Sequence, residues 1–241
     1  MKNKIRLGVN VDHVATLRQV RGGKTSYPSL LEMVQASVRA GADQITIHLR
    51  EDQRHIQLHD LVLLSQKCPV DLNLEMAVNP DMVKLANKYK PEWCCFVPEK
   101  RQELTTEGGL DVIKNKKNIQ AAIEKLQARG VEISLFIAPD LSQVKAAFEV
   151  GADAVEFHTG HWVLYTGLKK KKEWARLKKA ARMAHSLGLR VHAGHGLDYK
   201  HSKMIRSLPD LKEVNIGHFL ICEALKNGLY SSVKKMVQTL K

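Results

Sequence analysis

The chain lacks a hydrophobic run long enough to cross a membrane, and it is poor in cysteine. Of its 241 residues, 44% are hydrophobic, yet no stretch of about 18 consecutive apolar residues occurs. The N-terminus has no apolar segment of the kind that precedes a signal-peptide cleavage site. The four cysteines show neither C-x-x-C nor zinc-finger spacing, so they fit buried side chains in a reducing compartment better than a metal centre. We therefore expect a cytoplasmic protein with no membrane partner.

Aromatic and acidic residues are also scarce. Aromatics make up 5% of the chain, and 38 lysines and arginines against 25 aspartates and glutamates give a net charge of +13. A positive net charge favours binding to nucleic acid, to an anionic membrane or to small anionic substrates. Proteins that bind unpaired bases rely on aromatic stacking, so the scarcity of aromatic residues weakens the case for nucleic acid. Much of the excess charge lies in helix-like segments, 114–117 and 169–172 among them, where a solvated helix face explains it. Small anionic substrates are the favoured partners, and a basic nucleic-acid-binding protein is an alternative.

Eight short apolar segments are typical of β-strands, and in five of them apolar and polar residues alternate with a period of two. In the second of them Ile45 and Ile47 alternate with Thr46 and His48. Helix-like patterns separate these segments, so the strands should run parallel and be covered by helices. The predicted strands are 5–12, 44–49, 71–77, 93–98, 132–138, 154–159, 189–194 and 213–219. The predicted helices include 28–40, 79–89, 117–129, 141–150, 173–187 and 202–207.

The repeated order of strand and helix predicts one closed α/β fold. Gly41 and Gly151 each stand between a predicted helix and the next strand, where left-handed backbone turns the chain back. No linker rich in proline or serine divides the chain, and about 250 residues is the usual size of a (β/α)8 barrel. We predict that residues 1–241 form a single TIM-barrel catalytic domain, a (β/α)8 barrel with a closed parallel sheet and extra helices. An open doubly wound sheet is the alternative.

Ionisable side chains occur near the C-terminal ends of several predicted strands. An unpaired polar group in a covered interior costs about 1–3 kcal/mol, so their repetition around one sheet indicates chemistry. Barrel enzymes carry their active sites at this end of the sheet, and two carboxylates with two histidines could transfer several protons near neutral pH. The candidate catalytic residues are His48, Glu75, Glu156 and His195, with Asp12 and His13 beside them.

Cationic and glycine-rich segments at the same end predict anion binding. Arg50 and His55 follow the second strand and suit a phosphate or carboxylate. Segments 194–196 and 215–218 follow the last two strands, where this fold commonly holds a phosphate on backbone N–H groups. Two long glycine-bearing loops, 18–29 and 99–116, are candidate lids.

A catalytic metal is not predicted. His158 and His161, like His192 and His195, are separated by two residues, a spacing that does not turn both rings toward one ion in an extended or looping chain. A metal-dependent barrel hydrolase or isomerase is the alternative within the same fold.

Short segments spread in order over nearly the whole chain form a specific pattern. They are Gly8-Val-Asn-Val-Asp-His13, Ala15-Thr-Leu-Arg18, Ile47-His-Leu-Arg-Glu-Asp52, Asn73-Leu-Glu-Met-Ala77, Phe96-Val-Pro-Glu-Lys-Arg-Gln102, Thr105-Thr-Glu-Gly-Gly-Leu-Asp111, His158-Thr-Gly160, Ala193-Gly-His-Gly196 and Asn215-Ile-Gly-His218. This pattern resembles that of the pyridoxine 5′-phosphate synthase family of bacterial vitamin B6 biosynthesis.

The resemblance implies a (β/α)8 barrel that assembles into a homo-octamer. It implies a transferase-class, ring-closing synthase that condenses 3-amino-2-oxopropyl phosphate with 1-deoxy-D-xylulose 5-phosphate. The implied products are pyridoxine 5′-phosphate, inorganic phosphate and water, and no metal or organic cofactor is implied.

Carried over position by position, the resemblance also implies roles for individual residues. Proton transfer falls to His48, Glu75 and His195, and Glu156 stabilises a transition state. The implied ligands of the deoxyxylulose phosphate are Asp12, His13, Arg50, His55 and Thr105. The implied ligands of the aminoketone phosphate are Asn10, Arg21, Gly196, Gly217 and His218.

The chain departs from the family pattern in three places. His192 stands where the family usually has asparagine, close enough in sequence to His195 to alter its pKa. Segment 161–165 replaces a usual Tyr-Ala stretch, and segment 169–179 is rich in lysine instead of alanine and glutamate. The last two departures bear on subunit contacts more than on chemistry.

Overall fold

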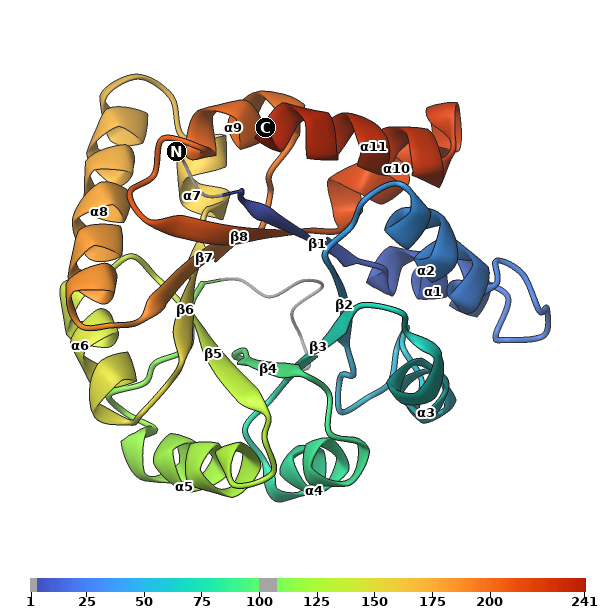
Figure 1. The fold of residues 1–241 in the computed structure, drawn as a ribbon, viewed down its shortest axis with the longest axis horizontal. Helices are drawn as coiled ribbons and strands as arrows, with labels where there is room; N and C mark the ends of the chain where they lie inside the picture. The colour runs from blue at the N-terminus through green and yellow to red at the C-terminus, as the bar shows by residue number, and fades with distance from the viewer. Residues whose placement is uncertain (1–3, 100–107) are drawn as a thin grey trace.

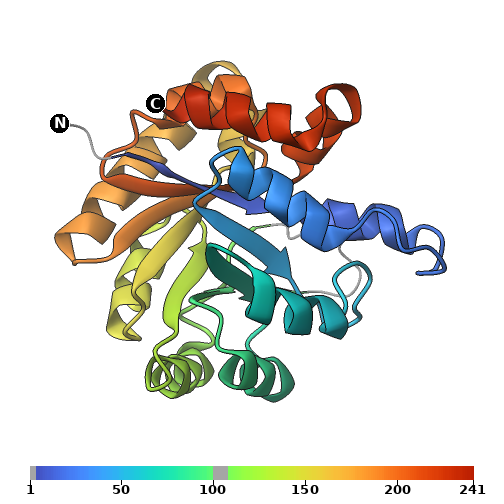
Figure 2. The ribbon, with the colours of Figure 1, turned by 45° about the vertical axis from the view of Figure 1, so that its right-hand side comes forward.

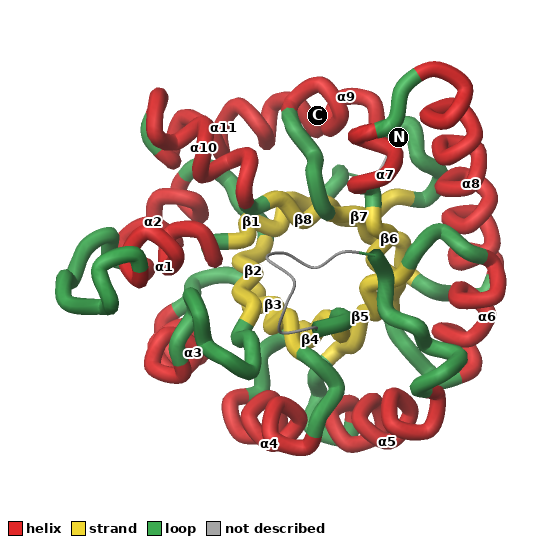
Figure 3. Tube along the Cα trace, turned by 180° about the vertical axis from the view of Figure 1, so that it is seen from behind, coloured by secondary structure: helices red, strands yellow, loops and turns green. Residues whose placement is uncertain are grey.

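Eight parallel strands close into one barrel in the computed structural model, which describes residues 4–99 and 108–241 (Figure 1). Each strand pairs with the next, and the last pairs with the first, so the sheet forms the complete ring seen in Figure 3. The strands are β1 (Arg6–Asn10), β2 (Gln44–His48), β3 (Asp71–Met76), β4 (Trp93–Phe96), β5 (Glu132–Ile137), β6 (Ala154–His158), β7 (Arg190–Gly194) and β8 (Leu211–Ile216). The predicted (β/α)8 barrel is confirmed, and the alternative of an open doubly wound sheet is wrong.

Helices surround the barrel on the outside (Figures 1 and 2). They are α1 (Asp12–Gln19), α2 (Leu30–Arg39), α3 (Leu58–Lys67), α4 (Pro80–Tyr89), α5 (Lys116–Gln127), α6 (Leu141–Glu149), α7 (Gly160–Leu164), α8 (Gly167–Ser186), α9 (Tyr199–Ile205), α10 (His218–Asn227) and α11 (Leu229–Leu240). Side chains cap several of them: Asn79 Oδ1 accepts the Met82 N–H at 2.9 Å where α4 begins. In the part of the chain that the structure describes, no helix has the length and apolar character to cross a membrane.

Each strand shows one face to the helices and the other to the barrel interior. In β2, Ile45 and Ile47 belong to the hydrophobic core between sheet and helices, whereas Gln44 and Thr46 donate hydrogen bonds to Asn215 of β8 inside the barrel. Because successive side chains of a strand point to opposite faces, the polar residues seen in the sequence gather at the centre of the barrel.

The first strand is shorter than predicted. It ends at Asn10, and Asp12 and His13 lie in the first turn of α1 instead of on the strand. Asn10 Oδ1 accepts the Asp12 N–H at 2.9 Å, which satisfies an amide that a helix start leaves without a backbone partner. The helix continues through Arg18, predicted as loop, whose guanidinium forms a bidentate pair with Asp60 at 2.7 and 2.6 Å.

Several other boundaries also differ from the prediction. β8 ends at Ile216, so Phe219 belongs to α10. α8 begins at Gly167, earlier than residue 173, because its lysine-rich first turns carry too few apolar residues to show a helical stripe in the sequence. The predicted left-handed glycines are confirmed, with φ of +104° at Gly41 and +81° at Gly151.

Candidate active site

A cavity of about 790 Å³ opens at the C-terminal ends of the strands. This volume lies within the range of small-molecule sites. All four predicted catalytic residues and most of the predicted binding residues line it. The predicted residues in the wall are Asn10, Asp12, His13, His48, Arg50, His55, Glu75, Glu156, His195, Gly196, Gly217 and His218.

Of the predicted binding residues that the structure describes, Arg21 alone is not among those that line the cavity. Arg21 lies in an exposed turn of the loop between α1 and α2, which projects away from the barrel (Figure 2). Gly22 and Gly23 take φ of +64° and +68° in that turn, values that glycine adopts without strain. A binding role for Arg21 therefore requires the loop to move toward the cavity. Thr105, like part of the second candidate lid, lies outside the described residues.

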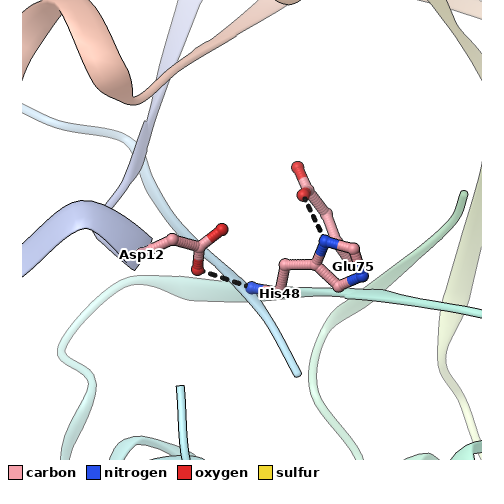
Figure 4. Close-up of side chains that lie close together, drawn as sticks. All are labelled: Asp12, His48 and Glu75. Carbon is pink, nitrogen blue, oxygen red and sulfur yellow. Dashed lines mark hydrogen bonds and ion pairs between the residues drawn. The ribbon is translucent and has the colours of Figure 1, made fainter. Parts of the chain in front are cut away.

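Asp12, His48 and Glu75 form a compact polar group in the wall (Figure 4). Asp12 Oδ1 accepts the backbone N–H of His48 at 2.8 Å, and Asp12 Oδ2 accepts an Asn10 amide N–H at 2.9 Å. His48 Nδ1 lies 3.8 Å from Glu75 Oε2. One donor atom from each of the three residues lies within 4.8 Å of the others, close enough for the group to hold a metal ion.

Burial shifts the pKa of both candidate catalytic carboxyl groups upward. The pKa of Glu75 stands well above its usual value because burial disfavours the charged form, and the charges of Asp12 and Glu156 add to the shift. Burial also raises the pKa of Glu156 to about 8, against the opposing hydrogen bond from Asn215 and together with the charge of Glu213. A pKa of about 8 lets Glu156 hold and release a proton near neutral pH, as a general acid or base must.

Sequence reasoning did not assign a role to Glu99, a buried carboxylate behind this group. Glu99 Oε2 lies 3.6 Å from His48 Nε2, and Glu99 Oε1 lies 3.6 Å from Arg50 Nε. Burial opposes ionisation of Glu99, but its contacts with His48, the Glu51 amide and Arg50 lower its pKa overall. Its charge therefore faces both His48 and Arg50. The segment containing Glu99 was part of the family pattern, yet its position after a strand gave no sign of these contacts.

His195 follows β7 in a left-handed turn. Its φ of +76° is unusual for a residue with a side chain. Thr159 Oγ1 holds the turn by donating to the carbonyls of Gly194 at 2.7 Å and His195 at 2.6 Å. The His195 ring packs on His158, with 4.7 Å between ring centroids. Burial, with the nearby His195 and His161, lowers the pKa of His158 to about 3, so His158 stays neutral and supports the ring of His195.

The start of α10 forms the wall on the β8 side. Gly217 is its N-cap residue, and Gly217 and His218 both line the cavity. A helix start offers unpaired N–H groups and a positive dipole end, which favour a phosphate. A Cβ atom at residue 217 would lie 2.9 Å from Asn10 Oδ1, so glycine permits the close packing there. The ring of His13 lies 5.1 Å from that of His218, and burial lowers the His13 pKa.

Basic side chains also lie on the β2 side of the cavity. Arg50 is buried, and burial also lowers the pKa of His55. Arg54, which sequence reasoning did not single out, lines the cavity as well and pairs with Asp52 at 2.7 Å. Groups suited to bind an anion therefore lie on two sides of the cavity, at the start of α10 and around Arg50 and Arg54.

The fold and the wall together define an enzyme with its active site at the C-terminal mouth of a (β/α)8 barrel. The family model described as pyridoxal phosphate biosynthesis protein PdxJ matches residues 7–241. The chain therefore belongs to this family of biosynthetic enzymes, which confirms the resemblance seen in the sequence.

Individual relatives agree with the family. A pyridoxine 5′-phosphate synthase of Bdellovibrio bacteriovorus is 66% identical over 241 residues, with 100% of both chains covered. One of Magnetococcus marinus is 50% identical over 238 residues, with 98% of this chain and 97% of the relative covered. Among solved structures, KGPDC from Streptococcus mutans aligns with a TM-score of 0.65 at 15% identity over 99% and 98% of the two chains. That likeness concerns the fold alone.

Proposed function

We propose that this chain is a pyridoxine 5′-phosphate synthase, which condenses 3-amino-2-oxopropyl phosphate with 1-deoxy-D-xylulose 5-phosphate. The products are pyridoxine 5′-phosphate, inorganic phosphate and water. The observation that carries the proposal is the joint placement of two carboxyl groups and two imidazoles in one cavity wall, those of Glu75, Glu156, His48 and His195. The names of the relatives at 66% and 50% identity support the same reaction.

The reaction requires proton transfers at several stages. Imine formation, loss of water and phosphate, and ring closure each move protons between neighbouring atoms, and positioned side chains accelerate such steps. His48 Nδ1 and Glu75 Oε2 lie 3.8 Å apart, longer than a hydrogen bond but close enough for both groups to act on one bound substrate. We assign proton transfer to His48, Glu75 and His195, and stabilisation of a transition state to Glu156.

Two anionic substrates match the two anion-binding sides. The proposed ligands of the deoxyxylulose phosphate are Arg50 and His55 on the β2 side, together with Asp12, His13 and Thr105. The proposed ligands of the aminoketone phosphate are Gly196, Gly217 and His218 on the β8 side, together with Asn10 and Arg21. A phosphate close to His13 or His55 would favour the protonated imidazole and so offset the effect of burial on its pKa.

The direct test is to incubate the purified protein with both phosphorylated substrates. Pyridoxine 5′-phosphate should appear by its absorbance and by mass spectrometry, together with an equal amount of inorganic phosphate. Reactions that lack either substrate serve as controls. Absence of the product with both substrates present, from protein with the expected fold, would contradict the proposal.

The group formed by Asp12, His48 and Glu75 favours one other candidate, a metal-dependent barrel hydrolase or isomerase. Its donor atoms are close enough for an ion, whereas our proposal assigns the same atoms to proton transfer. Dialysis against a chelator, followed by metal analysis and assay, separates the two candidates. We expect turnover to survive chelation, and loss of turnover that is restored by one added metal would favour the alternative.

We also propose that the enzyme is cytoplasmic and that residues 1–241 act as one catalytic domain in a homo-octamer. Large apolar side chains on the surface support assembly: Leu164 is 78% exposed, and Leu168 and Leu225 are each 74% exposed. Light scattering coupled to size exclusion should give a mass of about eight times the 27.1 kDa of one chain. A mass of one or two chains would contradict the octamer.

A further inference from the structure

A buried polar network lies directly beneath Glu156. Asn215 of β8 donates from Nδ2 to Glu156 Oε2 at 2.7 Å, and the same amide nitrogen lies 3.4 Å from Glu213 Oε1. An amide NH2 has two protons, so each can be directed to one of these two carboxyl groups. Asn215 thus links the proposed catalytic carboxyl group to a second buried one deeper in the barrel.

The other end of the same amide is held as firmly. Thr46 Oγ1 donates to Asn215 Oδ1 at 3.1 Å, and Gln44 Nε2 donates to it at 3.3 Å. Gln44 Nε2 also donates to Glu213 Oε1 at 2.8 Å. Because donors occupy the carbonyl side, the NH2 group must face Glu156.

Two glycines provide the space in which this contact is made. A Cβ atom at Gly8 would lie 1.8 Å from Asn215 Oδ1, and one at Gly194 would lie 2.1 Å from Glu156 Oε1. Both distances are far below van der Waals contact, so a side chain at either position would displace one of the hydrogen-bonding partners. The backbone of β1 and β7 therefore fits this particular arrangement of Asn215 and Glu156.

We propose that Asn215, anchored by Thr46 and Gln44, is a positioning residue that fixes the carboxyl group of Glu156 in the cavity wall. The inference rests on the proposed function, since Glu156 is assigned its role there. Buried polar groups that are fully hydrogen-bonded adopt one arrangement, whereas loss of a partner leaves them free to rotate or to seek another. Without Asn215 the Glu156 side chain would lose the orientation that the reaction uses.

The first test is steady-state kinetics of Asn215→Ala with Ser134→Ala as a control. Ser134 is a buried polar residue of β5 that makes none of the hydrogen bonds of this network. Because misplacement of a catalytic group by about 1 Å can cost about 100-fold, we expect Asn215→Ala to lower kcat by about 10- to 100-fold. KM for both substrates should stay within about threefold, and Ser134→Ala should change kcat by less than about threefold. Equal kcat in Asn215→Ala and wild type would overturn the proposal.

Thr46→Val provides a second variant that keeps the shape of the side chain and removes the hydroxyl that donates to Asn215. It should lower kcat by a smaller factor of about three to ten, again with KM unchanged. This variant keeps the proposal testable if Asn215→Ala does not fold. A kcat in Thr46→Val equal to that of wild type would contradict the anchoring role.

A double-mutant cycle shows whether Asn215 acts through Glu156. In a Glu156→Ala background, Asn215→Ala should lower kcat by less than about twofold, because the group that it positions is absent. Additive losses would mean that Asn215 acts elsewhere and would overturn the inference. If Glu156→Ala alone leaves kcat unchanged, the role proposed for Glu156 fails; if only Asn215→Ala is silent, the positioning role alone fails.

Discussion

The inside of the barrel and the layer between barrel and helices are built by the same strands, yet their chemistry is opposite. In β3, Leu72 and Leu74 belong to the hydrophobic core on the helix side, whereas Asn73 bonds across the barrel interior and Glu75 lines the cavity. Burial of the apolar side chains stabilises the fold, and burial of the carboxyl groups raises their pKa values. Stability and reactivity are therefore separated by a single step along a strand, and neighbouring residues should fail in different ways.

Glu75→Gln should give the largest loss on the interior side. The amide keeps the shape of the side chain but cannot accept a proton, so we expect kcat to fall by about 1,000-fold or more. The fold should be intact by circular dichroism and thermal unfolding. Activity within about tenfold of wild type would contradict the assignment of Glu75 as a base.

Leu74→Ala, one residue away, should show the opposite pattern. Leu74 is fully buried on the helix side, and truncation of a buried leucine costs about 2–5 kcal/mol of unfolding free energy. Denaturant unfolding should show this loss, while the fraction of enzyme that stays folded keeps the wild-type KM. A stable Leu74→Ala with impaired kcat would mean that the two layers are not separable.

Arg50→Ala and His55→Ala should weaken binding more than chemistry. A charge-assisted hydrogen bond to a phosphate contributes about 1.5–3 kcal/mol, so KM for deoxyxylulose phosphate should rise by about 10- to 100-fold. KM for the aminoketone phosphate serves as the internal control and should change little. An unchanged KM for deoxyxylulose phosphate in both variants would refute their placement.

The raised pKa of Glu156 should make stability fall with pH. The folded protein holds this proton up to about pH 8, whereas the ordinary carboxyl pKa is 4.5. The stability that it contributes is therefore complete below the unfolded-state pKa and is lost as pH rises through the folded-state pKa. The side chain in Glu156→Gln cannot ionise. The melting temperature of this variant should therefore fall less than that of wild type as the pH rises from about pH 5 to about pH 8. Replacement of the exposed Glu124 by Gln should keep the wild-type slope, and identical slopes in all three proteins would contradict the interpretation.

Replacing Lys169–Lys172 with glutamine should have the smallest effect on turnover. Lys169, Lys171 and Lys172 are exposed at the start of α8, on the outside of the barrel. We expect kcat and both KM values to stay within about twofold, with changes confined to solubility or subunit assembly. A large loss of activity in a variant that assembles normally would show that these lysines recruit substrate.

Most of the fold could be read from local patterns, and the exceptions have clear physical causes. Short apolar runs located all eight strands, and in five of them period-two alternation also separated the two faces, which meet different surroundings. The alternation extended β1 and β8 too far because Asp12 and His218 continue the polar pattern at positions where the backbone has already turned into a helix. The His192 ring, flagged for its closeness to His195 in sequence, instead packs on Trp93 with centroids 5.2 Å apart.

By itself the sequence determined which side chains reach the mouth of the barrel, because strand period and strand order fix that placement. It also determined the family, because the matching segments span the chain. Only the tertiary structure decided which groups touch: that Glu99 faces both His48 and Arg50, and that Asn215 lies between Glu156 and Glu213. The contacts of Glu99 with His48 and of Asn215 with Glu156 join residues that are far apart in the sequence. They depend on barrel closure and on the space left by Gly8 and Gly194, which no local pattern encodes.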